Sequence, residues 1–338
     1  MEIFLYEFMT SGGLWTKPDW GEPESSLVSE GLLMLRAITD DFARIPHLRI
    51  TGMWDQRLDC KRLPPSLNVS HVHSMADHDR LLDRSLREAD VVMVIAPELD
   101  RILESIVQRI PPNKFALNPL GEFVRITADK WLSFQTFQQA GIPTPPTSLG
   151  NKIDLSVVCG FQTIVQKLRW GAGSQAMSVI PFETWTHQPS VGDNEIIQPW
   201  LPGRPASVSF LCGPNQRLAL PAMWQSIDGK SFEYLGGSKI EEDELTDRAH
   251  RLASQALDAL PPATGYVGVD LLLGATADDD YVVEVNPRLT TSYVGLRQLS
   301  TINLAWAMWK IAEGLTVSGS WNANDGRFRV ADKTQWDE

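Results

Sequence analysis

The chain has 338 residues, of which 43 % are hydrophobic and 21 % charged, as in a globular protein with a buried core. Its 42 Asp and Glu residues outnumber its 30 Lys and Arg residues, so the formal net charge is −12. This balance argues against nucleic acid or an anionic membrane as the main partner, because clustered cations bind both.

The first third of the chain alternates between apolar strand-like runs and segments with helical spacing. The run at 89–95 (ADVVMVI) is typical of a strand buried on both faces of a sheet. We therefore expect a parallel α/β layer, and the Pro-rich segment 143–146 is typical of a domain boundary. In chain order, the expected elements are a strand at 2–9, a helix at 25–44, a strand at 89–95 and helices at 99–110 and 129–140.

Short apolar strands separated by glycine and proline turns follow, which is an antiparallel pattern. The strands 266–273 and 281–285 are joined by the acidic turn 275–280 and are expected to form a hairpin. Residues 322–338 are polar and are expected to be a loose tail. The other expected elements are strands at 163–168, 177–180, 195–200, 207–212 and 217–227 and helices at 241–260 and 303–313.

Cysteine usage and the chain start indicate the compartment. Three cysteines without CxxC spacing favour reduced thiols over a disulfide framework or a zinc site. The amino terminus lacks the basic segment of a signal peptide, and no apolar stretch approaches the ~18 residues that cross a bilayer. We expect a cytoplasmic protein, and a homodimer is left open.

The strongest candidate site lies on the expected hairpin. Glu284 and Asn286 are two residues apart on one strand and therefore face the same side, where Asp270 on the partner strand is also expected. Two carboxylates and an amide oxygen form the all-oxygen ligand set that suits Mg²⁺. Arg288 shares this face and is a candidate to bind a γ-phosphate or an anionic intermediate. A merely solvated polar face does not explain a Glu and an Asn among valines in a buried strand.

Two further segments are candidates for nucleotide binding. The strand 163–168 delivers Lys167 into the turn Gly171-Ala172-Gly173-Ser174, where backbone N–H groups and an ammonium group would both face a phosphate. The turn also matches GxGxxG/A, but a strand follows it where the dinucleotide fold requires a helix. The segment Gln198-Pro199-Trp200-Leu201 ends an apolar strand and suits an adenine edge, although alone it indicates only an edge strand, which tolerates Pro199.

The order of these segments resembles the ATP-grasp superfamily, whose members carry a lysine that opens a helix, a strand lysine before a glycine-rich flap, an adenine hinge and a late D…ExN metal hairpin. The matching residues here are Lys130, Lys167 with Gly171–Ser174, Gln198–Leu201, and Asp270, Glu284, Asn286 and Arg288. The resemblance covers about residues 1–315. It implies an N-terminal parallel α/β domain (1–118), a small lid (119–202), a C-terminal antiparallel α+β domain (203–321) and a polar tail (322–338).

The resemblance also implies a ligase that uses ATP and Mg²⁺ (or Mn²⁺). In the implied mechanism a substrate carboxylate attacks the γ-phosphate, and an amine then displaces phosphate from the acyl phosphate. Lys130, Lys167 and Arg288 offset the phosphate charge, with Lys167 and Arg288 as the catalytic pair. Such chemistry depends on positioning and electrostatics and requires no Ser or His nucleophile. The implied partners are therefore a small carboxylic acid and an amine.

Within the superfamily, Glu7, Gly12-Gly13 and the run Asn286–Ser292 are similar to the tyramine–glutamate ligase group of methanofuran biosynthesis. This similarity implies L-glutamate, through its γ-carboxylate, and tyramine or tyrosine as substrates. Trp15 and Tyr293 are expected near the cleft, where their rings would stack on an aromatic amine, unless they are core. The implied substrate-binding residues are Glu7, Gly12, Gly13, Gly236, Gly237, Thr290 and Thr291.

Some features fit less well or remain open. Pro199 replaces a frequent hinge acid, and Gly203-Arg204-Pro205 stands where a ribose-binding Glu is common. Gly236–Lys239 is equally well explained as a hairpin turn, and the histidines at 71, 73 and 78 favour a surface strand end over a metal cluster. The alternative functions are a kinase-like phosphotransferase on the same fold, a nucleotide-binding regulator without turnover and, more distantly, a dinucleotide oxidoreductase.

Overall fold

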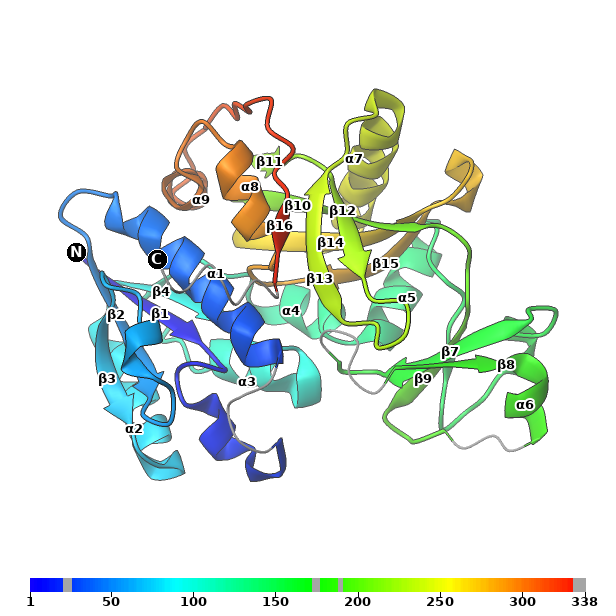
Figure 1. Cartoon of the computed structure of the whole chain (residues 1–338), viewed down its shortest axis with the longest axis horizontal. Coiled ribbons are helices and arrows are strands. Elements are labelled where there is room, and N and C mark those ends of the chain that lie inside the picture. The colour runs from blue at the N-terminus through cyan, green and yellow to red at the C-terminus, as the bar shows by residue number, and fades with distance from the viewer. Residues whose placement is uncertain (21–25, 172–176, 188–190, 331–338) are drawn as a thin grey trace.

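The structure is a computed structural model that describes residues 1–20, 26–171, 177–187 and 191–330. Within these residues three β-sheets follow one another along the molecule (Figure 1). We call them the amino-terminal sheet (β1–β5), the lid sheet (β6–β9) and the large sheet (β10–β16). The large sheet lies between the other two (Figure 1).

The amino-terminal sheet is parallel, as predicted, with the strand order β3-β2-β1-β4-β5. Because β1 and β4 are neighbours, their carboxyl ends lie together at the edge where open α/β sheets bind ligands. Helices α1 and α2 begin after β1 and β3 and pack on this sheet. The elements are β1 Glu2–Glu7, α1 Ser26–Ala43, β2 Arg49–Asp55, β3 Asn68–Val72, α2 Met75–Glu88, β4 Val91–Ile95, α3 Ile102–Val107 and β5 Phe115–Ala116.

The lid sheet is antiparallel, in the order β6-β9-β7-β8. Strand β9 is not an edge strand, because β6 and β7 flank it, but Pro199 lies beyond the residues that pair with β6. The missing N–H of proline therefore breaks no ladder bond to β6. The elements are α4 Gly121–Thr127, α5 Lys130–Gln139, β6 Ser148–Leu149, β7 Thr163–Leu168, β8 Ser178–Pro181, α6 Phe182–His187 and β9 Glu195–Pro199.

The large sheet is antiparallel, in the order β15-β14-β10-β12-β13-β16, with β11 paired to β10. The predicted strand at 217–227 is two strands, β11 and β12, which both pair with β10, because the ladder is interrupted at residues 220–222, where Pro221 has no N–H to donate. The elements are β10 Arg204–Cys212, β11 Arg217–Ala219, β12 Met223–Ile227, β13 Tyr234–Lys239, α7 Asp243–Asp258, β14 Gly265–Leu273, β15 Tyr281–Asn286, α8 Tyr293–Leu299, α9 Leu304–Ala312 and β16 Phe328–Arg329.

The prediction of a loose tail from residue 322 is wrong for its first part, because β16 pairs with β13. Phe328 is buried and its ring contacts Tyr234. A Cβ on Gly236, whose φ is +139°, would lie 2.1 Å from the Phe328 carbonyl oxygen, so only glycine admits the strand. Gly236 and Gly237 thus belong to strand β13 and not to a turn, and a contact between them and a substrate stays a prediction.

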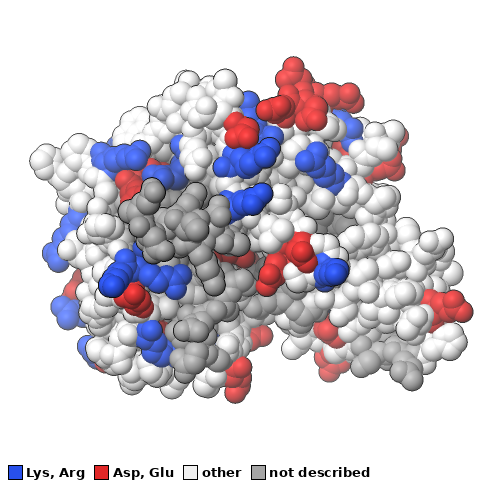
Figure 2. All heavy atoms as spheres, in the orientation of Figure 1, with Lys and Arg blue, Asp and Glu red and all other residues white. Residues whose placement is uncertain are grey.

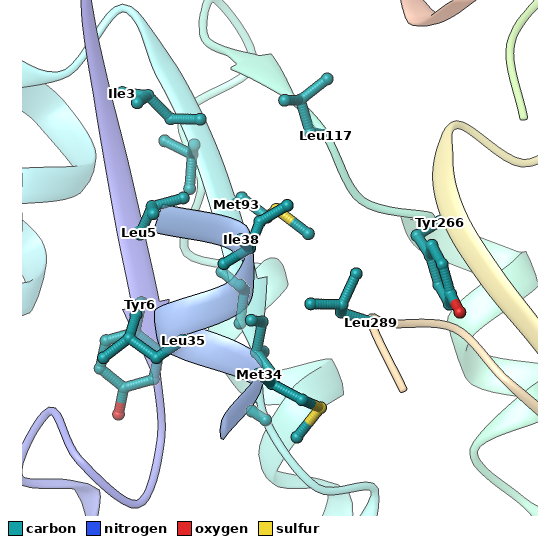
Figure 3. Packing of buried hydrophobic residues seen from close by; sticks show 14 of the residues in the cluster. Ile3, Leu5, Tyr6, Met34, Leu35, Ile38, Met93, Leu117, Tyr266 and Leu289 are labelled. Atoms are coloured by element: carbon teal, nitrogen blue, oxygen red, sulfur yellow. The ribbon is translucent and has the colours of Figure 1, made fainter. Parts of the chain in front are cut away.

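One buried cluster joins the amino-terminal sheet to the end of the chain. Helix α1 packs on β1 with one side and on α8 and α9 with another. Figure 3 shows Leu289 on the side of Met34 and Ile38 that faces Tyr266, and all four belong to this cluster. The segment from Leu289 to α9 is therefore held against α1 by apolar contacts.

The charged surface is mixed in sign. Acidic and basic side chains are interspersed over the face drawn in Figure 2, which also shows acidic side chains gathered at one corner. In the part of the chain that the structure describes, no helix has the combined length and apolarity of a membrane span.

Candidate active site

The predicted hairpin is confirmed, and its geometry brings the three predicted metal ligands together. β14 and β15 are antiparallel, with Asp270 directly opposite Glu284 and Gly268 opposite Asn286. The Asn286 amide donates to Asp270 Oδ2 at 2.9 Å, and Gln225 Nε2 on β12 donates to Asp270 Oδ1 at 2.8 Å. Opposed strand residues share a face, so two carboxylates and an amide stand side by side.

Lys130 connects this hairpin to the lid. It is the first residue of α5, which Asp129 caps by accepting from the N–H groups of Trp131 and Leu132. The ammonium group lies 3.0 Å from Glu284 Oε2 and donates to the carbonyl oxygen of Gly171 at 2.7 Å. One lysine thus contacts both the hairpin and the start of the glycine-rich turn.

Lys167 lies near the same carboxylates. It stands in β7, and burial lowers its pKa to about 8, with the positive charge of Lys130 acting in the same direction. Glu284 and Asp270 oppose this shift, so both lysines are within electrostatic reach of the hairpin. A buried ammonium next to a second one is a site that an anion stabilises.

The two hairpin carboxyl groups are electrostatically unequal. Burial and the charge of Glu284 raise the pKa of Asp270 to about 7. Burial alone would raise the pKa of Glu284 as well, but Lys130 and Lys167 hold it below its ordinary value. Repulsion between the two groups is the condition that a divalent cation relieves, and the donors are all oxygen. The residues present therefore fit Mg²⁺ or Mn²⁺. Among the described residues, no cluster of three or more His, Cys, Asp or Glu side chains suits a metal, and the hairpin set has only two such members.

The predicted adenine segment ends β9. The Gln198 side chain is buried and donates to Thr147 Oγ1 at 2.9 Å. The Trp200 N–H donates to the carbonyl oxygen of Thr163, while the Trp200 side chain is exposed. Because the Trp200 N–H already donates within the lid sheet, other groups of the segment 198–201 would have to bind the adenine. In the glycine-rich turn, Gly171 is described, whereas Ala172, Gly173 and Ser174 lie outside the described residues.

Arg288 has a partner that the sequence did not indicate. Its Nε atom donates to Glu98 Oε1 at 2.9 Å and to Oε2 at 3.1 Å. Its Nη2 atom donates to Glu98 Oε2 at 2.9 Å. Glu98 follows β4 by two intervening residues, so it lies at the carboxyl end of a parallel strand. The position of Glu98 just after a predicted parallel strand could have indicated a site residue, because ligands bind at the carboxyl ends of such strands.

Glu7, at the end of β1, is 2 % exposed and accepts from the N–H of Met9, the N–H of Thr10 and the Thr10 hydroxyl. Burial raises its pKa to about 7 against these donors. Gly12 and Gly13 continue the same turn, since the Gly13 N–H donates to the Phe8 carbonyl. The turn therefore stands at the ligand-binding edge of the sheet.

Thr290 and Thr291, which follow Arg288, are tied to different parts of the molecule. The Thr290 hydroxyl is 3.1 Å from that of Tyr266. The Thr291 hydroxyl donates to Glu30 on α1, also at 3.1 Å. The predicted substrate residues of this segment thus lie where the large sheet meets the amino-terminal part of the chain.

The predicted ring-stacking role of Tyr293 is wrong. Its side chain is fully buried and its hydroxyl donates to Asp41 at 2.6 Å, so the residue is core. Trp15 is instead half-buried, with its ring under the Arg57 guanidinium and its N–H donated to Asp55. The histidine prediction is confirmed in part: His71 is in β3, and His78 is buried in α2 beside Tyr6.

The chain is similar to known proteins over most of its length. Residues 127–292 match a family model described as "ATP-grasp domain", and residues 48–120 match one described as "pre ATP-grasp 3 domain". The chain is 25 % identical over 300 residues to tyramine–L-glutamate ligase of Methanocaldococcus fervens, covering 87 % of this chain and 89 % of that protein. The same enzyme of Methanocaldococcus jannaschii is 25 % identical over 301 residues, covering 87 % and 84 %.

Solved structures show the same fold. A protein of Archaeoglobus fulgidus described as a putative ATP-grasp superfamily protein superposes with a TM-score of 0.72 and 24 % identity, covering 94 % of this chain and 89 % of that one. N5-carboxyaminoimidazole synthetase of Staphylococcus aureus, solved with ADP, superposes with a TM-score of 0.69 and 12 % identity, covering 95 % and 79 %.

Proposed function

Because this chain belongs to the ATP-grasp superfamily, we propose that it is an ATP-dependent ligase that activates a carboxylate as an acyl phosphate and couples it to an amine. The observation that carries the proposal is the convergence of Asp270, Glu284 and Asn286 with Lys130 and Lys167. Two carboxylates and two ammonium groups in one partly buried place suit a divalent cation and a polyphosphate together.

Asp270, Glu284 and Asn286 are the residues that would hold Mg²⁺ or Mn²⁺. The bound cation would supply positive charge to the β- and γ-phosphates, which lowers the cost of attack by an anionic carboxylate. Lys130 would bring the start of the flap to the nucleotide, because it already contacts both Glu284 and Gly171. Lys167 would bind phosphate, and its burial strengthens that attraction.

The nucleotide would lie between the lid sheet and the large sheet. In this proposal Gly171–Ser174 cover the phosphates and Gln198–Leu201 bind the adenine. The proposed domains are the N-terminal α/β domain (1–118), the lid (119–202) and the C-terminal α+β domain (203–321). The chain's own contribution is then to orient the reactants and exclude water, since the attacking groups belong to the two substrates.

We further propose that the acid is L-glutamate, reacting through its γ-carboxylate, and that the amine is tyramine or tyrosine in methanofuran-type cofactor biosynthesis. The names of the two curated relatives support this substrate pair, since both are tyramine–L-glutamate ligases. Glu7 with Gly12 and Gly13, and Thr290 with Thr291, are the proposed substrate residues. In support, Thr290 contacts Tyr266 of the large sheet, and Thr291 contacts Glu30 of α1, which packs on the sheet whose strand β1 ends at Glu7.

Product analysis tests the proposal. The protein is incubated with ATP, Mg²⁺, L-glutamate and each member of a panel of amines, and the products are identified by mass spectrometry. We expect an amide of glutamate with tyramine or tyrosine, together with equal amounts of ADP and phosphate, and no product when either substrate is omitted.

Two other outcomes are informative. Consumption of another acid in place of glutamate would contradict the substrate pair and leave the ligase class standing. Accumulation of a phosphorylated acid without any need for an amine would contradict the ligase and favour the phosphotransferase.

A further inference from the structure

Glu98, in the amino-terminal part of the chain, forms an ion pair with Arg288, which follows the hairpin of the large sheet. They are 190 residues apart in sequence, and their side chains are 5 % and 13 % exposed. Three N–H···O contacts of 2.9 to 3.1 Å join them. A planar guanidinium held by both oxygens of a carboxylate has one fixed orientation, which a lysine in its place would not have.

The pairing occupies one edge of the guanidinium. Arg288 has five N–H donors, and Glu98 takes the Nε edge while the Leu289 carbonyl oxygen accepts from Nη1 at 3.3 Å. The remaining donors on the two terminal nitrogens are thereby aimed away from Glu98. An arginine held in this way presents a fixed pair of donors, which matches the oxygens of a phosphoryl group.

The position of Arg288 makes those donors relevant to the reaction. Asn286, two residues before Arg288, donates to Asp270 at 2.9 Å. Glu98, which accepts from Arg288, follows β4 at the sheet edge where Ile95 pairs with Glu7 of β1. Arg288 therefore stands between the hairpin and the edge that carries the turn after β1. It lies two residues after Asn286, at the boundary between the proposed metal site and the proposed substrate residues.

The backbone that follows Glu98 has an unusual conformation two and three residues later. Asp100 and Arg101 both adopt left-handed angles, with φ of 49° and 61°, although neither is glycine. Lys17 binds Asp100 at 2.9 Å, and Arg101 donates to Glu104 at 2.7 Å. Strained backbone of this kind persists where the surrounding structure enforces it, and it clusters at functional sites.

We propose that Glu98 is a positioning residue, which holds Arg288 with its free donors directed at the transferable phosphate of the bound nucleotide. The proposal rests on the proposed function, because it presupposes a nucleotide at the hairpin. Glu98 does not itself touch the reactants. Its carboxylate fixes the guanidinium plane and offsets its charge while the pair is buried, so the arginine needs no reorganisation during phosphoryl transfer.

The alternative is that the pair only ties two parts of the molecule together. Asp41 and Arg297 provide a matched comparison, because Arg297 also donates twice to a buried carboxylate of the amino-terminal part, at 2.6 and 3.1 Å. That pair joins α1 to α8 and lies outside the proposed site. A purely mechanical role predicts that Glu98→Gln and Asp41→Asn have similar effects on activity.

Nucleotide binding separates the two roles without knowledge of the acid or the amine. Dissociation constants of Mg²⁺-ADP and of a non-hydrolysable Mg²⁺-ATP analogue are measured by calorimetry for the wild type, Glu98→Gln and Asp41→Asn. We expect Glu98→Gln to reduce the preference for the ATP analogue over ADP by about tenfold, because only the analogue carries the phosphate that Arg288 would contact. We expect Asp41→Asn to retain the preference.

Turnover and a double variant complete the test. With the substrates of the product screen, we expect Glu98→Gln to lower kcat by about 10- to 100-fold, as misplaced catalytic groups do, and to raise the KM of ATP by no more than about tenfold, in line with the weaker binding of the analogue. Adding Glu98→Gln to Arg288→Lys should cost nothing further, because Glu98 acts only through the arginine. If Glu98→Gln does not fold, Glu98→Asp replaces it, because this variant keeps the charge on a shorter side chain. We expect Glu98→Asp to show a smaller loss of kcat and a smaller loss of preference for the ATP analogue.

The outcomes are distinguishable. Equal losses in Glu98→Gln and Asp41→Asn, an unchanged nucleotide preference, or additive losses in the double variant would each overturn the positioning role and leave the ligase intact. A wild-type protein that binds neither nucleotide would overturn the proposed function, and the role of Glu98 with it.

Discussion

Glu284 is the residue on which the proposed chemistry depends most. Its carboxylate contacts Lys130 and faces Asp270, so it connects the lid to the hairpin. Glu284→Gln keeps the shape of the side chain and removes its charge. We expect kcat to fall by about 100-fold or more, because metal and phosphate lose a charged partner, while circular dichroism stays unchanged.

Asp278→Asn is the control for this variant, because Asp278 is an exposed acid in the turn of the same hairpin. It should turn over at the wild-type rate. Near-normal turnover in Glu284→Gln would remove Glu284 from the metal site.

Glu7 is a residue whose protonation should be visible in stability. Its pKa in the folded protein is about 7 against an ordinary 4.5, chiefly because it is buried. Between these values the folded protein holds a proton that the unfolded chain releases, so this group favours folding at low pH and loses that contribution as pH rises through 7. We expect the free energy of unfolding of the wild type to fall relative to that of Glu7→Gln between pH 5 and 8, by on the order of 1–3 kcal/mol.

Urea unfolding of both proteins at several pH values measures this difference. Parallel pH profiles would show that Glu7 is ionised throughout and that its three donors outweigh its burial.

One glycine of α1 reflects the packing around Glu7. Gly31 lies within the helix, where glycine costs about 1 kcal/mol relative to alanine. A Cβ at this position would lie 2.4 Å from Glu7 Oε1, so a larger residue would clash with the carboxylate.

Single residues were predictable where one local rule determined them. Alternation along a strand placed Glu284 and Asn286 on one face, and the hairpin added Asp270. Glu98 was not predictable in the same way, since its role depends on an approach between residues 190 positions apart. Tyr293 shows the opposite error: it was predicted near the cleft but is core, because its hydroxyl donates a hydrogen bond to Asp41, 252 residues away in sequence.

At the scale of elements, the turn between β14 and β15 holds the hairpin in shape. The sequence indicated an acidic turn at 275–280, and its last residue, Asp280, is buried and binds Arg248 of α7 at 2.6 and 2.9 Å. Their side chains are 6 % and 7 % exposed. Asp280→Ala leaves a buried guanidinium without its carboxylate, and we expect about 3–5 kcal/mol of destabilisation.

Thermal or urea unfolding measures this loss, and Asp278→Ala, at the exposed position two residues earlier, should change stability by less than about 0.5 kcal/mol. Equal stabilities of the two variants would mean that the Asp280–Arg248 pair contributes nothing to holding the turn.

Long elements with clear periodicity were predictable, and short ones were not. The helix expected at 129–140 is α5, and the strand expected at 89–95 contains β4. The two residues of β16 form a strand because the Phe328 ring packs against Tyr234 and because the glycines of β13 allow β16 to approach closely. That is a tertiary effect without local periodicity, so residues 322–330 were mistaken for tail.

At the scale of the whole molecule, the segment from Arg288 to α9 ties the amino-terminal part of the chain to the large sheet. Glu98, Glu30 and Asp41 of the amino-terminal part accept from Arg288, Thr291 and Arg297 respectively. The proposed metal ligands Glu284 and Asn286 immediately precede this segment. The reacting groups would therefore lie where the amino-terminal part of the chain is fixed to the large sheet. The spacing of apolar residues predicted the parallel layer and the antiparallel strands that follow it, but not the contacts that hold these parts together.

The fate of a carboxylate oxygen tests the central claim, activation of an acid as an acyl phosphate, most directly. The acid identified by the product screen is labelled with ¹⁸O in its reacting carboxylate, and the phosphate released during amide formation is analysed by mass spectrometry. Attack of the carboxylate on the γ-phosphate, followed by displacement by the amine, predicts one ¹⁸O atom in each phosphate. Unlabelled phosphate accompanying the amide, or label retained in a stable phosphorylated acid, would contradict it.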